Sequence, residues 1–338
     1  MNLLKPSKLK DRKKSFLSKD TFVYIPPMAG VTDIAYRTLC REMDENVVLA
    51  TEMLSSKSLT YAHVNKKDHH HAQRLTIPEG DKLTGVQIFG HEPGVMAEAT
   101  KIATDLGATF IDINMGCPVA KIVNGMDGAA LMREPELACK IVEQVKASTH
   151  LPVTVKTRLG WCEDSLNAPE LAKELEKLGI AAITIHGRTR AQKYTGTAKW
   201  SLIKEVVDAV EIPVFANGDV KTLDDAKNIY DETGAYGIAI ARGTMGKPWF
   251  SKQVTHYIET GEILEEPSLE KKLELARKHC ELLVEHKGQY IGIRESRRHI
   301  NNYISGLRGA SKLRSRINQI ETVDDARREI DLILENNT

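Results

Sequence analysis

The stretch Ile111–Pro118, Ile-Asp-Ile-Asn-Met-Gly-Cys-Pro, is the most informative part of the sequence. A β-branched run ends in Asn114, a glycine turn follows, and Cys117 stands directly before a proline. This order is typical of an apolar strand that delivers a polar side chain at its C-terminal end and carries a thiol on the next loop. In chains built from repeated strand–helix units, catalytic groups lie at that position.

Similar apolar runs recur on both sides of this stretch and alternate with helical patterns. The eight runs are Phe22–Ile25, Val47–Ala50, Gly85–Phe89, Phe110–Ile113, Val153–Val155, Ala182–Ile185, Val214–Ala216 and Gly237–Ile240. Helical patterns between them include Pro93–Leu106, Pro135–Ser148, Pro169–Leu178, Ser201–Val210 and Leu223–Glu232. Eight such units predict an α/β protein with a (β/α)8 TIM barrel rather than a doubly wound sheet.

The sequence changes character after about Pro248. Strand-like runs stop, and apolar residues step at helical spacing along one face from residue 269 to residue 283. Two more helical patterns cover Arg294–Tyr303 and Val323–Leu334, the last starting at Thr322 or Asp324. We therefore expect a basic N-terminal tail in residues 1–20, a catalytic TIM barrel in residues 21–255 and a small helical domain in residues 256–338.

The net charge of +1 hides an uneven distribution. Residues 1–19 hold seven Lys or Arg and one Asp, and residues 271–319 hold twelve Lys or Arg and four Glu. Residues 320–338 hold six acidic residues and two Arg, so residues 20–270 carry a net charge of −9. An acidic body with two basic segments suits a polyanion such as a nucleic acid. The alternative is a solvated helix face and a charged tail.

Nothing in the sequence predicts a membrane segment or a metal site. No apolar stretch approaches 18 residues, and the Lys-rich N-terminus lacks the apolar segment of a secretory signal. Five scattered cysteines without metal-ligand spacing favour a reduced cytoplasm. We interpret His69–His71 as a polar loop, because consecutive residues point in different directions and no Cys or carboxylate pair accompanies them.

A polar or glycine-rich segment follows each expected strand. In order these are Pro27-Met-Ala-Gly30, Glu52, Gln87, Asn114 with Cys117, Lys156, His186, Asn217-Gly-Asp219 and Arg242-Gly243. Loops after the last two strands of a barrel often bind phosphate. Small residues there let backbone N–H groups approach an anion, and Arg242 can pair with it. We expect a phosphorylated cofactor, FMN in particular; ordinary βα turns are the alternative.

Cys117 is the main candidate for a reactive thiol, because it lies beyond its strand in a glycine-rich loop. Cys162, on the loop after the fifth strand, is its rival, and the other three cysteines fall in helical patterns. Lys156, at the end of the fifth strand, can stabilise negative charge on a reduced flavin ring. A solvent-exposed lysine is the alternative interpretation.

Several motifs together resemble the tRNA-dihydrouridine synthase family, in particular its DusB-like bacterial branch. They are Pro27–Asp33, Gln87–Gly90, Asp112–Pro118, Gly128–Met132, Val155–Arg158, Ile185–Arg190, Asn217–Asp219 and Gly246–Trp249. The resemblance runs from about Tyr24 to Phe250 and more faintly beyond. It implies a flavin-dependent oxidoreductase of the cytoplasm that reduces the C5–C6 bond of uridine in the tRNA D-loop. FMN would be the cofactor and NADPH, or NADH, the reductant.

In the implied reaction, hydride passes from flavin N5 to C6 and a proton from Cys117 to C5. Carried over position by position, the FMN contacts are Pro27, Met28, Ala29, Gln87, Lys156, His186, Asn217, Gly218, Asp219, Ala241 and Arg242. Asn114 and Arg188 would hold the uracil. The helical domain of a monomer would bind the D-loop and elbow of tRNA, with Arg294, Arg297 and Arg298 on its basic side. The family usually has Ala at position 26 and Gly at position 241, where this chain has Pro26 and Ala241.

Two other interpretations stay open. An FMN barrel enzyme that acts on a free pyrimidine would not need the basic segments at residues 1–19 and 271–319. A non-redox RNA-binding protein on a barrel scaffold would not need Cys117, Lys156 or the two phosphate-type loops.

Overall fold

The computed structural model describes residues 17, 21–65, 75–78 and 80–337. Most of the expected basic tail, residues 1–20, and all of His69–His71 lie outside these residues. Leu17 is described, and it is buried in one apolar cluster with Tyr24, Phe110 and Phe215. In the described part of the chain, no helix is long and apolar enough to cross a membrane.

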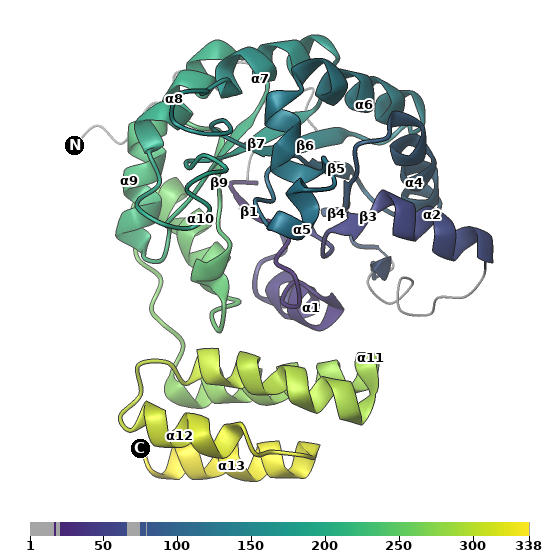
Figure 1. Cartoon of the computed structure of the whole chain (residues 1–338). Helices are drawn as coiled ribbons and strands as arrows, with labels where there is room; N and C mark the ends of the chain where they lie inside the picture. The colour runs from purple at the N-terminus through teal and green to yellow at the C-terminus, as the bar shows by residue number, and fades with distance from the viewer. Residues whose placement is uncertain (1–16, 18–20, 66–74, 79, 338) are drawn as a thin grey trace.

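Parallel strands form a closed barrel at the centre of the molecule (Figure 1). The described strands are β1 (Val23–Ile25), β2 (Val48–Ala50), β3 (Leu54–Ser55), β4 (Thr84–Phe89), β5 (Ile111–Asn114), β6 (Val153–Arg158), β7 (Ala182–His186), β8 (Val214–Asn217) and β9 (Gly237–Ala239). Their order is β2-β1-β9-β8-β7-β6-β5-β4-β3, and the pairing of β2 with β4 closes the sheet. The predicted TIM barrel is confirmed, and β3 is a short addition that the sequence pattern did not indicate.

Most helices cover the outer face of this sheet (Figure 1). The helices of the barrel are α1 (Ile34–Met43), α2 (Ser56–Asn65), α4 (Pro93–Asp105), α6 (Pro135–Ala147), α7 (Ala168–Lys177), α8 (Trp200–Ala209), α9 (Leu223–Thr233) and α10 (Phe250–Thr260). The short helix α5 (Ala120–Val123) and the 3-10 turn η2 (Gly128–Arg133) lie in the connection after β5, and a second 3-10 turn, η3 (Arg242–Thr244), follows β9. Local signals explain several starts. Proline occupies the first turn of α4, α6 and α7, and Thr222 forms a capping box at α9.

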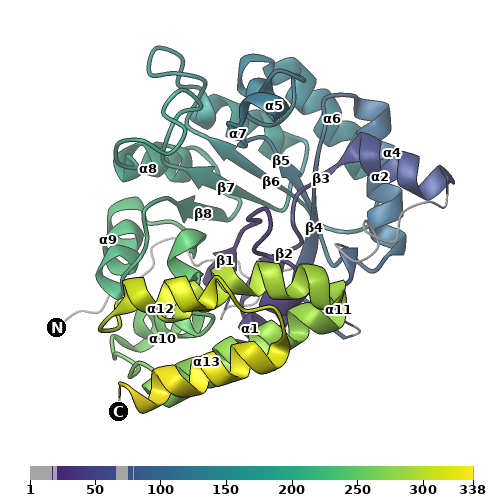
Figure 2. The ribbon, with the colours of Figure 1, turned by 60° about the horizontal axis from the view of Figure 1, so that its bottom comes forward.

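The C-terminal region is a layer of helices on one side of the barrel (Figure 2). It consists of α11 (Leu269–Tyr303), α12 (Ala310–Ile317) and α13 (Val323–Glu335), the last capped by Thr322. α11 reverses direction at Gly288, whose φ of 74° and ψ of 163° are not helical. Its second arm packs closely on the first, because a Cβ atom at Gly292 would lie 2.6 Å from the Leu283 carbonyl oxygen. The helix expected at residues 294–303 is part of this second arm.

The helical layer docks against α1. The Tyr36 ring lies 5.8 Å from the His279 ring and 6.2 Å from the His299 ring, and the two imidazoles are 4.1 Å apart between centroids. The Lys287 ammonium donates to the Asp33 carboxylate at 2.6 Å. The expected division after residue 255 falls inside α10, which packs on the barrel. Burial lowers the pKa of both histidines, that of His279 to about 3.

Acidification should weaken folding through His279. A histidine that stays neutral in the folded protein takes up its proton first in the unfolded state, so its contribution is lost as the pH falls below about 6.5. We expect a loss of about 1.4 kcal/mol in the free energy of unfolding between pH 7.5 and 5.5 from this residue. Urea unfolding at both pH values should show that His279→Leu loses that much less than the wild type. Equal losses would contradict the prediction.

Candidate active site at the barrel mouth

Five polar side chains predicted from the sequence lie at the carboxyl ends of neighbouring strands. Gln87, Asn114, Lys156, His186 and Asn217 come from β4, β5, β6, β7 and β8 in that order. The parallel register pairs Asn114 with Lys156 and His186 with Asn217. Hydrogen bonds join the five into two groups, one that leads to Cys117 and one centred on Asn217.

The first group starts from a buried carboxylate inside the barrel. Asp112 accepts hydrogen bonds from the Tyr24 hydroxyl at 3.1 Å, the Gln87 amide at 2.6 Å and the Thr154 hydroxyl at 2.7 Å. The donors come from β1, β4 and β6, so the carboxylate on β5 ties four strands together. Burial raises the pKa of Asp112, and the three donors oppose that rise.

Each donor in this group determines the orientation of the next. Because Gln87 Nε2 donates to Asp112, Gln87 Oε1 faces Asn114 and accepts from its Nδ2 at 2.7 Å. Asn114 Oδ1 then accepts from the backbone N–H groups of Gly116 at 3.1 Å and Cys117 at 2.9 Å. The buried carboxylate thus orients the turn that carries the thiol. Asn114, which the resemblance assigned to the uracil, shapes this turn.

Cys117 is half-buried at the end of the turn. Burial raises the pKa of its thiol, and a backbone N–H together with the cations of Arg158 and Lys156 opposes the rise. Arg158 donates to the Gly116 carbonyl oxygen at 2.6 Å and to the carbonyl oxygens of residues 189 and 193. Arg158 was not among the site residues predicted from the sequence, although its spacing of two from Lys156 on one strand places both side chains on the same face.

The rival thiol lies elsewhere. Cys162 is on the loop after β6, where its Sγ lies 3.3 Å from the Ser165 hydroxyl. The resemblance gave it no role, and it belongs to neither group of hydrogen bonds at the strand tips. Cys117 is therefore the better placed of the two.

The second group is centred on Asn217. Its Nδ2 donates to the Ala239 carbonyl oxygen at 2.7 Å, which identifies Oδ1 as the atom that accepts from Lys156 Nζ at 3.2 Å and from His186 Nδ1 at 2.7 Å. Burial and neighbouring cations hold the pKa of His186 well below its usual value, so its Nε2 carries no proton. That Nε2 is buried without a hydrogen-bond partner among the described residues. It fits a ligand that offers an N–H or O–H group.

Lys156 is the cation at the centre of the mouth. Burial, followed by the nearby Arg158, lowers the pKa of Lys156 to about 8. About nine-tenths of such a lysine is still protonated at pH 7. It can therefore stabilise negative charge that develops on a bound ring, as the sequence predicted.

The loops after β8 and β9 carry both signs of charge. Asp219 accepts from the Ala198 N–H at 2.8 Å and from Arg188 at 2.6 Å. Arg188 is buried and also donates to the carbonyl oxygens of residues 195 and 196. Arg242 is mostly exposed, with its guanidinium 4.0 Å from Asp219. Arg188 and Asp219 thus brace a loop, whereas Arg242 presents a cation to an incoming anion.

The loop after β1 contains the three residues Pro27, Met28 and Ala29. The Met28 carbonyl oxygen accepts from the N–H groups three and four residues further on, which closes a tight turn. The Gly30 N–H donates to the buried carboxylate of Glu52. Arg298 of α11 covers this turn, since a Cβ atom at Gly30 would lie 3.3 Å from its guanidinium.

A pocket of about 760 Å³ lies between this loop and the helical layer. The barrel contributes Ala29, Phe89 and Ile122, and α11 contributes His286 and Lys287 among others. The volume is within the range of small-molecule sites. Because α11 supplies one wall, the pocket is complete only when the helical layer is in place.

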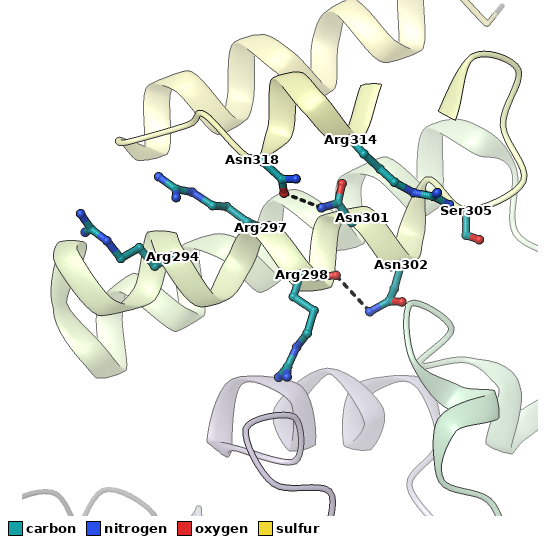
Figure 3. A pocket seen from close by; sticks show the side chains of 8 residues that line it. All are labelled: Arg294, Arg297, Arg298, Asn301, Asn302, Ser305, Arg314 and Asn318. Atoms are coloured by element: carbon teal, nitrogen blue, oxygen red, sulfur yellow. Dashed lines mark hydrogen bonds between the residues drawn. The ribbon is translucent and has the colours of Figure 1, made fainter. Parts of the chain in front are cut away.

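A second hollow, of about 490 Å³, opens on the helical layer itself (Figure 3). Arg294 stacks over the Tyr290 ring at 3.6 Å, and Arg297 donates to the Ile320 carbonyl oxygen. Arg298 points toward α1 (Figure 3). The hollow is lined by Arg294, Arg297, Arg298, Asn301, Asn302, Ser305, Arg314 and Asn318. The structure thus gathers the three predicted arginines on one arm of α11 and adds Arg314 from α12.

Comparison with known proteins gives the family. The model of the dihydrouridine synthase (Dus) family matches residues 24–337. The chain belongs to this family. A probable tRNA-dihydrouridine synthase of Rickettsia bellii is 40% identical over 297 residues, which cover 88% of this chain and 89% of that protein. The tRNA-dihydrouridine synthase B of Pseudomonas aeruginosa is 37% identical over 300 residues, 89% of each protein.

Solved structures add support for the fold. Histamine dehydrogenase from Rhizobium sp. 4-9 matches with a TM-score of 0.51 at 13% identity, over 82% of this chain and 48% of that chain. The match to the dihydrouridine synthase family confirms the resemblance predicted from the motifs. It also extends past the barrel through the whole of α13, into a region where the motifs were faint.

The Cys117 thiol should titrate at a higher pH than an ordinary thiol, because burial raises its pKa. Alkylation by iodoacetamide, followed at the Cys117 peptide by mass spectrometry, reports the thiolate as a function of pH. We expect a higher midpoint in the folded protein than in the same protein unfolded in urea. If the alkylation midpoint of the folded protein lies at or below that of the unfolded protein, the cations of Lys156 and Arg158 lower the pKa of Cys117 more than burial raises it.

Proposed function

We propose that this protein is a tRNA-dihydrouridine synthase that reduces the C5–C6 bond of uridine in the tRNA D-loop. The proposed cofactor is FMN, with NADPH or NADH as reductant. The names of the relatives support the reaction, and the hydrogen-bonded relay from Asp112 to Cys117 carries the assignment of the site. Residues 21–255 form the proposed catalytic barrel and residues 256–338 the proposed tRNA-binding domain.

The residues at the barrel mouth fit a phosphorylated flavin. FMN, when bound, supplies the hydride that adds to C6 of the uracil. The unpartnered Nε2 of His186 and the Lys156 ammonium suit the polar edge of a ring. The backbone at Gly218 and the exposed Arg242 offer donors to a phosphate. The proposed set is completed by Pro27, Met28, Ala29, Gln87, Asn217, Asp219 and Ala241.

Cys117 is the proposed proton donor to C5. Burial keeps its thiol protonated at neutral pH, which is the state a general acid needs. Once the proton has left, Lys156 and Arg158 favour the thiolate that forms. Asn114 holds the turn, so Sγ is presented from a fixed backbone.

The pocket between the barrel and α11 suits a base that has been taken out of RNA. A uridine must leave its stack before it can enter a barrel. Arg294 and Arg314 on the helical layer, together with Arg298 at the junction, suit the phosphates around it, with strong salt dependence. Asn114 and Arg188 remain the residues proposed to hold the uracil, through the loops that they brace. The protein is proposed to act as a monomer in the cytoplasm.

An absorbance spectrum of the purified protein tests the proposal first. We expect flavin bands that anaerobic NADPH bleaches and unmodified tRNA restores, whereas free uracil does not. Restoration by free uracil would identify an enzyme that acts on a free pyrimidine. A colourless protein that FMN cannot reconstitute would leave an RNA-binding barrel without redox chemistry.

Replacing Cys117 by alanine should separate proton transfer from cofactor binding. Cys117→Ala should bind FMN and accept electrons from NADPH like the wild type. It should form dihydrouridine at least about 100-fold more slowly, because a general acid contributes that factor or more. Cys162→Ser is the matched control and should turn over normally. Wild-type turnover of Cys117→Ala on intact tRNA would remove the proposed donor.

Replacing Arg294, Arg297 and Arg298 together by Gln should weaken tRNA binding, while the protein keeps its bound flavin. The plot of log affinity against log salt should become shallower by roughly 0.7 to 0.9 for each RNA phosphate that the variant no longer neutralises. Filter binding at several salt concentrations measures this. Arg327→Gln with Arg328→Gln is the control, since both cations are paired with acids at the protein surface. If the triple variant binds tRNA as tightly as the wild type, the three arginines only face solvent and do not contact the RNA.

A further inference from the structure

The backbone of Cys117 is held from two sides. Residues 117–128, here called the thiol loop, leave β5, form α5 and return so that the Ala129 N–H donates to the Cys117 carbonyl oxygen at 3.1 Å. Gly128 touches Cys117 directly, because a Cβ atom at Gly128 would lie 2.9 Å from that oxygen and 3.2 Å from the Cys117 Cβ. Where the loop returns therefore sets where the thiol-bearing residue sits.

A side-chain pair fixes this return. Asp127, next to Gly128, places its Oδ1 2.8 Å from Nδ1 of His91, on the loop after β4. In the part of the chain that the structure describes, this is the one side-chain hydrogen bond that residues 118–128 make outside the thiol loop. β4 also carries Gln87, which reaches the Cys117 N–H through Asn114. Both anchors of Cys117 thus begin at the same strand end.

We propose that His91 and Asp127 are positioning residues for proton transfer by Cys117. This proposal rests on the proposed function of that thiol. Their hydrogen bond holds the return of the thiol loop against the end of β4, and so keeps Sγ at one distance from the base. Misplacing a reacting group by about 1 Å costs up to a hundredfold in rate. Reduction of the flavin does not involve the thiol and should be spared.

The pair is better placed for this task than its neighbours on the surface. The His91 and Asp127 side chains are 30% and 19% exposed, whereas Lys57 and Glu92, which pair beside them, are 59% and 48% exposed. An ion pair as exposed as the second contributes little. Asp127 also lines the pocket and could affect binding directly, but His91 does not line it. His91 variants therefore report positioning alone.

A double-mutant cycle of His91→Ala and Asp127→Ala tests the proposal in the full-length flavoprotein. At saturating tRNA, each single variant should lower the rate of flavin reoxidation by about tenfold to a hundredfold. For His91→Ala, the rate of flavin reduction by NADPH and the tRNA dissociation constant should stay within about twofold of the wild-type values. The double variant should be no slower than either single one, because all three variants remove the same hydrogen bond. Asp127→Asn, which retains an acceptor for Nδ1, should recover most of the rate. Lys204→Ala, which removes an exposed ion pair with Asp208 near the end of α8, is the control and should match the wild type.

A second readout does not depend on turnover. Alkylation of the Cys117 peptide should be faster in His91→Ala than in the wild type, since the loop segment that packs against Cys117 is released. Additive losses in the cycle, or equal losses in the NADPH and tRNA half-reactions, would overturn the positioning role. If His91→Ala is normal while Cys117→Ala is inactive, only this inference fails. If Cys117→Ala turns over normally, the proton donor itself falls.

Discussion

The barrel mouth depends on one buried carboxylate. A carboxylate inside a protein is very costly unless donors surround it, so Tyr24, Gln87 and Thr154 all point at Asp112. That requirement fixes which end of the Gln87 amide faces inward, and the outward oxygen then selects the orientation of Asn114. The Asp112 carboxylate therefore determines the position of the Cys117 N–H group through three successive hydrogen bonds. With an apolar residue at position 112, no hydrogen bond would fix the orientation of the Gln87 amide, and through it that of Asn114.

The end of β4 acts as a common support. Gln87 leads to the N–H of Cys117, and His91 leads to the loop segment that holds its carbonyl oxygen. A proton donor has to be preorganised, since its bound geometry supplies part of the rate. The thiol itself sits on a loop, but the groups that hold it belong to, or directly follow, a strand of the rigid barrel.

The helical layer is joined to the same region. Asp33 caps α1 by accepting from the Tyr36 N–H at 3.0 Å, and it also accepts from Lys287 of α11 at 2.6 Å. α1 begins at Ile34, shortly after the turn at residues 27–30 that Arg298 covers. The proposed RNA-binding and flavin-binding parts therefore share one short segment of backbone. A change in how the helical layer sits would be felt first at that turn.

The barrel, its eight strand–helix units and the polar or glycine-rich segment after each strand could be predicted from the sequence, because hydrophobic periodicity and turn residues are local properties. It also predicted Cys117 over Cys162, because Cys117 lies in a glycine-rich loop beyond its strand. A polar Asp112 inside an apolar run was a visible signal that went unused. Tertiary structure alone decided the partners: Tyr24 meets Asp112 across 88 residues, His91 meets Asp127 across 36, and Gly288 folds α11 on itself. Hydrogen-bond direction and contact between distant segments arise only from packing, and periodicity carries no record of them.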